Sequence, residues 1–173
     1  RWAEERFHPP AIYLDGISMG AATVLMASGL ELPGSVRGII ADCGYTSPRA
    51  ILRKVIRQYH LPVGIMYFFV RLGARLFGHF DPEAASAVEA VEHCRVPVLF
   101  AHGEADGFVP CEMTRENYAH CASPKRLITV PGADHGFSYL IDRPRVETAL
   151  KRFFADTMKA SPIPTVAGDE GKA

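Results

Sequence analysis

Four short apolar runs, separated by longer segments with helical patterns, constrain the fold of this chain most strongly. The runs are rich in the aliphatic and β-branched side chains that buried strands use. They cover residues 11–15, 36–41, 96–101 and 126–130. Helical patterns follow three of them, at residues 18–29, 112–121 and 144–158. Because strands that alternate with helices build βαβ units, the sequence predicts an α/β fold with a parallel sheet flanked by helices.

The spacing of the runs also predicts the domain organisation. A chain of 173 residues suits one domain, and we expect that domain to cover residues 1–158. More than fifty residues separate the second and third runs, although a crossover between parallel strands needs only about a dozen. We therefore expect a helical cap insertion over about residues 45–93. Its predicted helices cover residues 47–59, 62–77 and 82–92. The polar, Pro/Gly-rich segment 159–173 is expected to be a disordered tail.

Composition and charge exclude several classes of protein. Lys and Arg together number 19, as do Asp and Glu, so no net charge would attract nucleic acid or an anionic membrane. The N-terminal residues contain no apolar signal-peptide core, and Pro62, Arg71 and Arg75 interrupt the most apolar stretch, residues 61–77. We expect a cytoplasmic protein without a nucleic-acid or membrane partner.

The cysteines form neither a Cys-x-x-Cys pair nor a zinc-like spacing with histidine. They are Cys43, Cys94, Cys111 and Cys121. The pattern predicts buried free thiols in a reducing compartment and no metal site. Cys43 follows Asp42 at a strand end and could face a site there, but a structural thiol is the favoured interpretation.

The segment Gly16-Ile17-Ser18-Met19-Gly20 is a G-x-S-x-G element between the first predicted strand and its following helix. In a strand–turn–helix setting, small neighbours let the backbone fold back on itself, and the serine hydroxyl projects above the sheet. The element therefore predicts Ser18 as a nucleophile and the Met19 N–H as an oxyanion-hole donor. The alternative is a Gly/Ser turn in which Ser18 is only the N-cap of the helix.

Candidate partners for Ser18 follow the third and fourth strands. Asp106 lies in the segment 102–110 after the third strand, and His135 lies in the segment 131–137 after the fourth. Because the carboxyl ends of parallel strands meet at one edge of a sheet, we expect both side chains near Ser18. Ser, Asp, His is also the chain order of a triad on such a sheet. His135 would be the general base, and Asp106 would orient it.

Nearby residues offer alternatives to this triad. Asp134 and Asp142 are close to His135 in the sequence, but sequence neighbours usually point their side chains apart, so Asp106 is favoured. His102 is interpreted as a strand-end residue with a satisfied hydrogen bond. The other histidines lack a partner pattern and are interpreted as surface or packing residues. They are His8, His60, His79, His93 and His120.

Together, these segments resemble bacterial α/β-hydrolase fold proteins of the esterase, thioesterase and acyl-peptidase type. The resemblance is carried by residues 12–26, 41–48, 102–110 and 130–135. It implies hydrolysis of an ester, thioester or amide through an acyl-serine intermediate, without a metal or another cofactor. Gly107 departs from the pattern, since relatives often have a second acidic residue there. Asp15 also departs, since it stands where relatives often have histidine.

The resemblance also implies where a substrate would bind. Such folds build a lid over the substrate from the segment that is inserted here, so we expect an acyl pocket formed partly by residues 45–80. The expected lining residues are Tyr45, Met66, Phe69 and Phe108. Without the resemblance, the aromatic segment that contains Met66 and Phe69 would be interpreted as core.

Members of this fold normally have about four strands before the serine strand, and a loop among them supplies the second oxyanion-hole N–H. Residues 1–7 resemble the end of the helix that directly precedes the serine strand. We therefore expect the chain to correspond to the C-terminal portion of a hydrolase, incomplete at its N-terminus. The exposed sheet edge beside the serine strand could then pair with a second copy and form a homodimer.

Three hypotheses of function remain open. The first is a serine hydrolase that cleaves a carboxylic ester or thioester. The second is a serine peptidase on short peptides, which would use the same triad with a different pocket. The third is a non-catalytic hydrolase-fold module that binds a partner.

Overall fold

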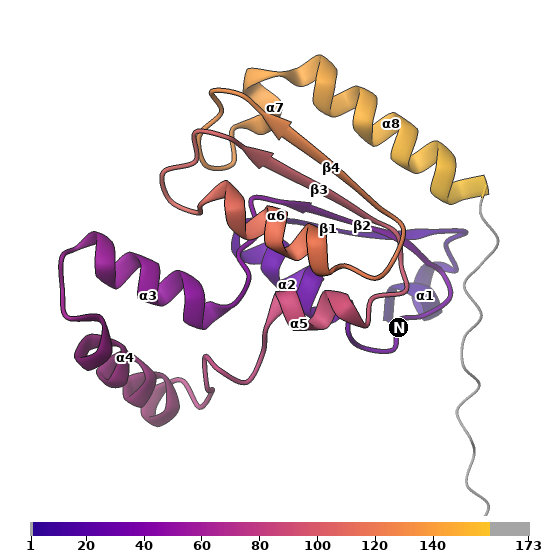
Figure 1. Ribbon diagram of the computed structural model, residues 1–173. Coiled ribbons are helices and arrows are strands. Elements are labelled where there is room, and N and C mark those ends of the chain that lie inside the picture. Colours follow the sequence, from indigo (N-terminus) through magenta and orange to yellow (C-terminus); the bar gives the residue numbers. More distant parts are fainter. Residues whose placement is uncertain (1, 160–173) are drawn as a thin grey trace, which may run out of the picture.

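The computed structural model describes residues 2–159, which form four strands and eight helices (Figure 1). In chain order they are α1 (Trp2–Phe7), β1 (Ile12–Ile17), α2 (Met19–Ala27), β2 (Val36–Asp42), α3 (Pro48–Gln58), α4 (Val63–Phe77), α5 (Ala87–Glu92), β3 (Val98–Gly103), α6 (Cys111–His120), β4 (Lys125–Val130), α7 (Ser138–Ile141) and α8 (Arg143–Lys159). The predicted alternation of strands and helices is confirmed.

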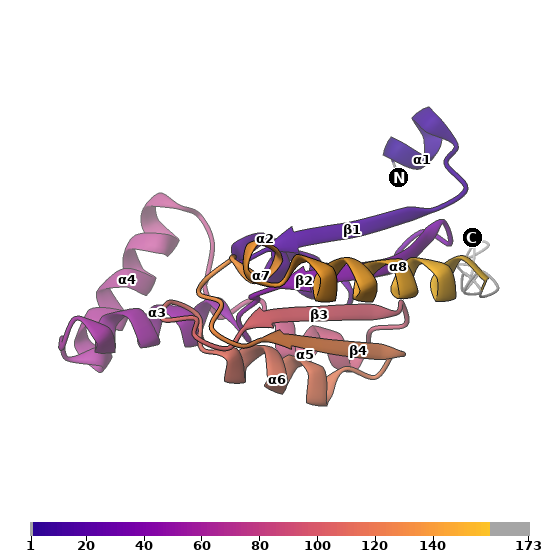
Figure 2. The same ribbon diagram turned by 90° about the horizontal axis from the view of Figure 1, so that it is seen from above.

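The strands form one parallel sheet in the order β1-β2-β3-β4. Helices α2, α5 and α6 cover one face of the sheet, and α8, preceded by the short α7, covers the other (Figures 1 and 2). The carboxyl ends of all four strands therefore lie at the same end of the sheet, at the left in both views. β1 is an outer strand of the described sheet. Dimer formation through its edge stays a prediction.

The main hydrophobic core lies between the sheet and the layer of α2, α5 and α6. Leu25 of α2, Ile39 of β2, Val91 of α5 and Phe100 of β3 are each at most 1% exposed. Burial of such a side chain contributes about 1.5–3 kcal/mol, so this layer holds the strands firmly in register. This packing therefore fixes the positions of the strand ends, where the candidate site residues lie.

A smaller cluster supports the segment that leads to His135. Val130, at the end of β4, and Ala133 pack against Val146 of α8. Both Val130 and Ala133 are fully buried. The chain between β4 and His135 is therefore anchored before it reaches the edge of the sheet.

Three strands end later than the sequence pattern predicts. β2 ends at Asp42 rather than at residue 41, and the differences at β1 and β3 concern the site. β1 runs to Ile17 rather than to residue 15, because Gly16 and Ile17 continue the pairing with β2. β3 covers Val98–Gly103 rather than residues 96–101. Pro97 has no N–H for the ladder, whereas His102 pairs with Thr129 of β4. Both strands therefore reach directly to the candidate site.

The predicted helix at residues 82–92 is wrong in its first half. The Asp81 carboxylate accepts a hydrogen bond from the Glu83 N–H, which forms a turn before the helix. The Ser86 hydroxyl then caps α5 by accepting from the Glu89 N–H. These two polar side chains compete successfully with the helical pattern, and α5 begins only at Ala87.

The predicted insertion at residues 45–93 is smaller in the structure. Helices α3 and α4 lie beyond the carboxyl ends of the strands (Figures 1 and 2), and we call residues 48–77 the cap. Arg71 of α4 ties the cap to the next loop through ion pairs with Asp81 (2.8 Å) and Glu83 (2.6 Å). Helix α5, in contrast, packs against α2 and α6 in the main core. It is therefore the crossover helix between β2 and β3.

No helix among residues 2–159 is long and apolar enough to cross a membrane. The tail that the sequence predicts at residues 159–173 lies outside the described residues, apart from Lys159, which ends α8.

Candidate active site

Ser18 lies on a strained turn between β1 and α2. Its φ is 57° and its ψ is −114°, a combination that non-glycine residues rarely adopt. The Ser18 N–H donates to the carbonyl of Asp42 (2.8 Å), so the turn is fastened to the end of β2. A side chain at Gly16 would place its Cβ 2.3 Å from the carbonyl carbon and oxygen of Gly20, so the fold-back requires glycine there.

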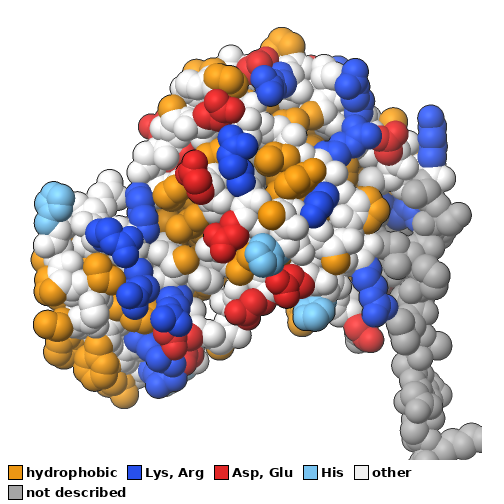
Figure 3. Space-filling model, in the orientation of Figure 1, with side chains coloured by type: hydrophobic (Ala, Val, Ile, Leu, Met, Phe, Trp, Pro, Cys, Tyr) orange, Lys and Arg blue, Asp and Glu red, His pale blue; other side chains and the backbone are white. Residues whose placement is uncertain are grey.

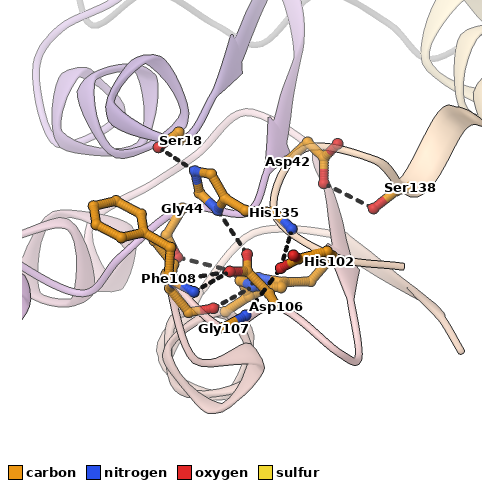
Figure 4. Close-up of polar contacts among 12 residues, drawn as sticks. Ser18, Asp42, Gly44, His102, Asp106, Gly107, Phe108, His135 and Ser138 are labelled. Atoms are coloured by element: carbon orange, nitrogen blue, oxygen red, sulfur yellow. Dashed lines mark hydrogen bonds and ion pairs between the residues drawn. The ribbon is translucent and has the colours of Figure 1, made fainter. Parts of the chain in front are cut away.

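The Ser18 hydroxyl makes no capping hydrogen bond to α2. Its Oγ instead lies 2.9 Å from Nε2 of His135, which comes from the loop between β4 and α7. Nδ1 of the same ring lies 2.7 Å from Oδ2 of Asp106, in the loop between β3 and α6 (Figure 4). The three side chains that the sequence singled out therefore form one continuous hydrogen-bonded chain at the carboxyl ends of three strands.

The Asp106 side chain is fully buried, and each of its carboxylate oxygens lies within hydrogen-bond distance of two nitrogen atoms. Oδ1 accepts from the backbone N–H groups of Phe108 (2.9 Å) and Val109 (2.8 Å). Oδ2 accepts from His135 and lies 3.1 Å from Nε2 of His102. His102 is thus in contact with the candidate acid, a relationship that its sequence position did not reveal.

The two alternative carboxylates have other partners. Asp134 accepts from the backbone N–H groups of Gly107 (3.0 Å) and His135 (2.7 Å). The pKa of the Asp134 carboxyl is lowered, mainly because it accepts the Gly107 hydrogen bond. Asp142 accepts from the Arg145 N–H at the start of α8. Asp134 therefore joins the two loops of the site, and Asp142 caps a helix.

Two further residues at the end of β2 lie beside the site. Asp42 accepts a hydrogen bond from the Ser138 hydroxyl (3.3 Å), and burial raises the pKa of its carboxyl. Cys43 is fully buried, and burial together with the charge of Asp42 raises the pKa of its thiol to about 12. A thiol that stays protonated at neutral pH is a poor nucleophile, so Cys43 is a weaker candidate nucleophile than its position suggests.

Within residues 2–159, one group of side chains has a donor arrangement that could hold a metal ion. The ligand atoms of Cys43, Asp106 and His135 lie within 4.8 Å of one another. Asp106 and His135 already share a hydrogen bond, and the raised pKa of Cys43 opposes the thiolate form that metals bind. The donors therefore suit a metal less well than they suit the hydrogen-bonded chain.

Of the expected pocket residues, Phe108 alone has a described contact with the candidate triad. Its ring packs edge-on against the His135 ring with 5.1 Å between centroids. Lys54 of the cap donates to the carbonyls of Gly107 (2.9 Å) and Phe108 (2.7 Å) and lies over the Phe108 ring. The cap is therefore bound directly to the loop that carries Asp106.

The other expected pocket residues are placed differently. The Tyr45 carbonyl accepts from Asn117 of α6, and burial raises the pKa of the Tyr45 hydroxyl. Met66 and Phe69 are on α4, where the Phe69 ring packs against Phe68 and is 59% exposed. Hydrophobic side chains gather over α4 at the lower left of Figure 3. Pocket roles for Tyr45, Met66 and Phe69 stay predictions.

A groove between β4, α6 and α8 lies away from these residues. Its walls include Leu127, Ile128, Arg145 and Arg152, and none of its lining residues belongs to the Ser18 site.

Helix α2 begins directly at the site with Met19. The first N–H groups of a helix have no partner within it, and the positive end of the helix dipole points toward Ser18. The Met19 N–H therefore stays the predicted oxyanion donor.

No family model matches the chain. Among curated proteins, the uncharacterized protein YqkD of Bacillus subtilis is 26% identical over 155 residues, which cover 89% of this chain and 50% of YqkD. The bifunctional esterase/perhydrolase DCH of Acinetobacter calcoaceticus is 32% identical over 45% of this chain and 36% of DCH. The chain spans about half the length, or less, of the curated relatives it matches.

Solved structures match the fold over nearly all of the chain. The Pyrococcus furiosus esterase PF2001 superposes with a TM-score of 0.65 at 19% sequence identity. The superposition covers 91% of this chain and 59% of the PF2001 chain. The chain therefore has the α/β-hydrolase fold, and its four parallel strands match part of the sheet of that fold.

Proposed function

We propose that this protein is a serine hydrolase that cleaves a carboxylic ester or thioester through an acyl-serine intermediate. Ser18 is the nucleophile, His135 the general base and Asp106 the acid that orients the base. The observation that carries the proposal is the continuous contact from Ser18 Oγ through His135 to Asp106 Oδ2, with distances of 2.9 and 2.7 Å. The first distance suits direct proton transfer, and the second suits the hydrogen bond by which Asp106 orients His135.

The proposed reaction follows from these contacts. His135 Nε2 takes the proton of Ser18 as Oγ attacks the acyl carbon, and Asp106 holds the other ring proton on Nδ1. The Met19 N–H stabilises the negative charge that develops on the carbonyl oxygen. His135 then gives its proton to the leaving alkoxide or thiolate. Water attacks the acyl-serine with His135 again as base, which releases the carboxylic acid and restores Ser18.

The comparisons support a hydrolase of ester type, and the thioester is part of the proposal. DCH is named an esterase/perhydrolase and PF2001 an esterase, and both resemble this chain. The placement of Phe108 against His135 adds an apolar surface beside the proposed base, where an acyl group or leaving group would lie. The same triad would serve a peptidase, so the substrate class is decided by assay.

The test compares the wild-type full-length protein with Ser18→Ala on p-nitrophenyl esters, a thioester and a peptide p-nitroanilide. Ser28→Ala is the matched control, because Ser28 lies at the other end of α2, where its hydroxyl contacts the Leu25 carbonyl and the Cys94 thiol and no residue of the proposed triad. We expect turnover of esters or thioesters, a loss of at least about 10³-fold in Ser18→Ala, and full activity in Ser28→Ala. Turnover of the anilide alone would favour the peptidase. Turnover that survives Ser18→Ala would reject the proposal.

A further inference from the structure

We infer that His102 is a positioning residue for Asp106. Its Nε2–H is shared between the Val109 carbonyl oxygen and Oδ2, the same carboxylate oxygen that contacts His135, so the Asp106 carboxylate has two imidazole neighbours. The inference rests on the proposed function, since it concerns the acid of the proposed triad. It adds a residue that the triad alone does not include.

The position of the His102 proton follows from its neighbours. Nε2 lies 2.9 Å from the carbonyl oxygen of Val109 and 3.1 Å from Oδ2 of Asp106. A carbonyl oxygen and a carboxylate oxygen only accept hydrogen bonds, so Nε2 must be the donor. Both His102 and Asp106 have fully buried side chains, which strengthens a hydrogen bond between them.

The other side of the His102 ring is also held. Nδ1 lies 2.7 Å from Oγ1 of Thr114 in α6, and this hydroxyl oxygen lies 3.1 Å from the carbonyl oxygen of Gly44, just after β2. The backbone of His102 pairs with β4. With Nε2 protonated, Nδ1 accepts from the Thr114 hydroxyl, so the β3 backbone and α6 fix the ring, and it cannot turn from Asp106 without breaking these contacts.

The two oxygens of Asp106 are held in different ways. Backbone N–H groups hold Oδ1, whereas the two imidazole rings meet Oδ2. Without the His102 proton, Oδ2 would carry more negative charge and would accept a stronger hydrogen bond from His135. A higher pH would then be needed to make the proposed base neutral. The carboxylate would also be less firmly oriented, which slows the chemical step.

The test uses a matched pair of neutral variants. In His102→Gln, the amide nitrogen stands as many bonds from Cβ as Nε2 does, so it keeps the donor to Asp106. In His102→Asn, the amide stands where Nδ1 does, so it keeps the Thr114 contact and loses the donor. Other titratable groups near the two rings are Asp42, Cys43, Asp134 and Lys54, and they are identical in both variants.

For His102→Asn, we expect kcat to fall about tenfold with an unchanged KM, because His102 is buried and does not touch substrate. The acid limb of the pH–rate profile should move up by about one pH unit, the size of one hydrogen bond to a charged group. His102→Gln should retain both the wild-type kcat and the wild-type profile. Equal behaviour of the two variants would overturn the inference and leave His102 with a structural role only.

Two controls keep the outcome clear. Nitrogen NMR of the wild-type protein, with labelled histidine, should show a protonated Nε2 on His102, and an unprotonated Nε2 would overturn the inference even if the Asn variant does not fold. Ser18→Ala in the same assay separates the two proposals. Activity that survives Ser18→Ala rejects the proposed function. Ser18-dependent activity with equal Asn and Gln variants rejects only the role of His102.

Discussion

Nε2 of His135 lies 2.9 Å from the hydroxyl oxygen of Ser18, although 117 positions separate the two residues in the chain. The sheet brings them together, because β1 ends next to Ser18 and β4 ends shortly before His135. Each side chain lies at the carboxyl end of a parallel strand. The contact therefore depends on the order of the strands and on the loops that follow them. Substitutions at the Ser18 turn and in these loops test the account.

Gly16 and Gly20 flank Ser18 symmetrically in the sequence, but only Gly16 is sterically required. A Cβ on Gly16 would lie 2.3 Å from the Gly20 backbone, whereas a Cβ on Gly20 would meet no atom within 4 Å. We expect Gly16→Ala to destabilise the protein by about 3 kcal/mol or more, since backbone must move. Gly20→Ala should change the free energy of unfolding by less than about 1 kcal/mol. Urea unfolding of both variants checks this, and equal losses would contradict it.

Asp106 and Asp134 provide a second matched pair. Asp106→Asn should lower kcat about 10³–10⁴-fold, because an amide at Oδ2 favours the wrong tautomer of His135. Asp134 contacts backbone N–H groups and not the His135 ring among its described bonds, so Asp134→Asn should cost less than about tenfold. Steady-state kinetics decide between them. A larger loss in Asp134→Asn than in Asp106→Asn would mean that the acid has been assigned to the wrong carboxylate.

Asp42 gives a pH-dependent effect on stability. Burial raises the pKa of its carboxyl in the folded protein, so the ionised form destabilises the fold at neutral pH. Below the unfolded pKa of about 3.9, the group is protonated in both states, and the penalty disappears. Asp42→Asn should therefore raise the free energy of unfolding at pH 7 and have no such effect below about pH 4. A stabilisation of equal size at both pH values would contradict this cause.

Cys43 should not react with iodoacetamide in the native protein at pH 8. Its thiol is fully buried, and its pKa is raised to about 12, so the reactive thiolate is scarce. Modification should appear only after unfolding, as peptide mass spectrometry would show. Rapid alkylation of native Cys43 with loss of activity would mean that the thiol, rather than the serine, is available at the site.

The sequence predicts this site well where a single local pattern determines the structure. The G-x-S-x-G element specifies a turn between a strand and a helix, and Asp106 and His135 follow later strands directly. Because parallel strands place their carboxyl ends together, the sequence predicts that these residues lie near one another, and the two loops then set the contacts.

Other features depend on contacts that the sequence does not display. His102 contacts Asp106 because β3 extends through it and the next loop turns back over Val109. The late start of α5 arises from the turn at Asp81 and the N-cap at Ser86, which compete with a helical pattern. A short helix such as α7, with four residues, has too few positions to show a period.

The most direct test of the central claim is the site of covalent labelling. The full-length protein is treated with a fluorophosphonate, digested, and the modified peptide is identified by mass spectrometry. We expect one adduct on Ser18, complete loss of the adduct in Ser18→Ala, and slow labelling in His135→Ala, because the hydroxyl then lacks its base. An adduct on Ser28, Ser47 or Ser138, or labelling that persists in Ser18→Ala, would contradict the account.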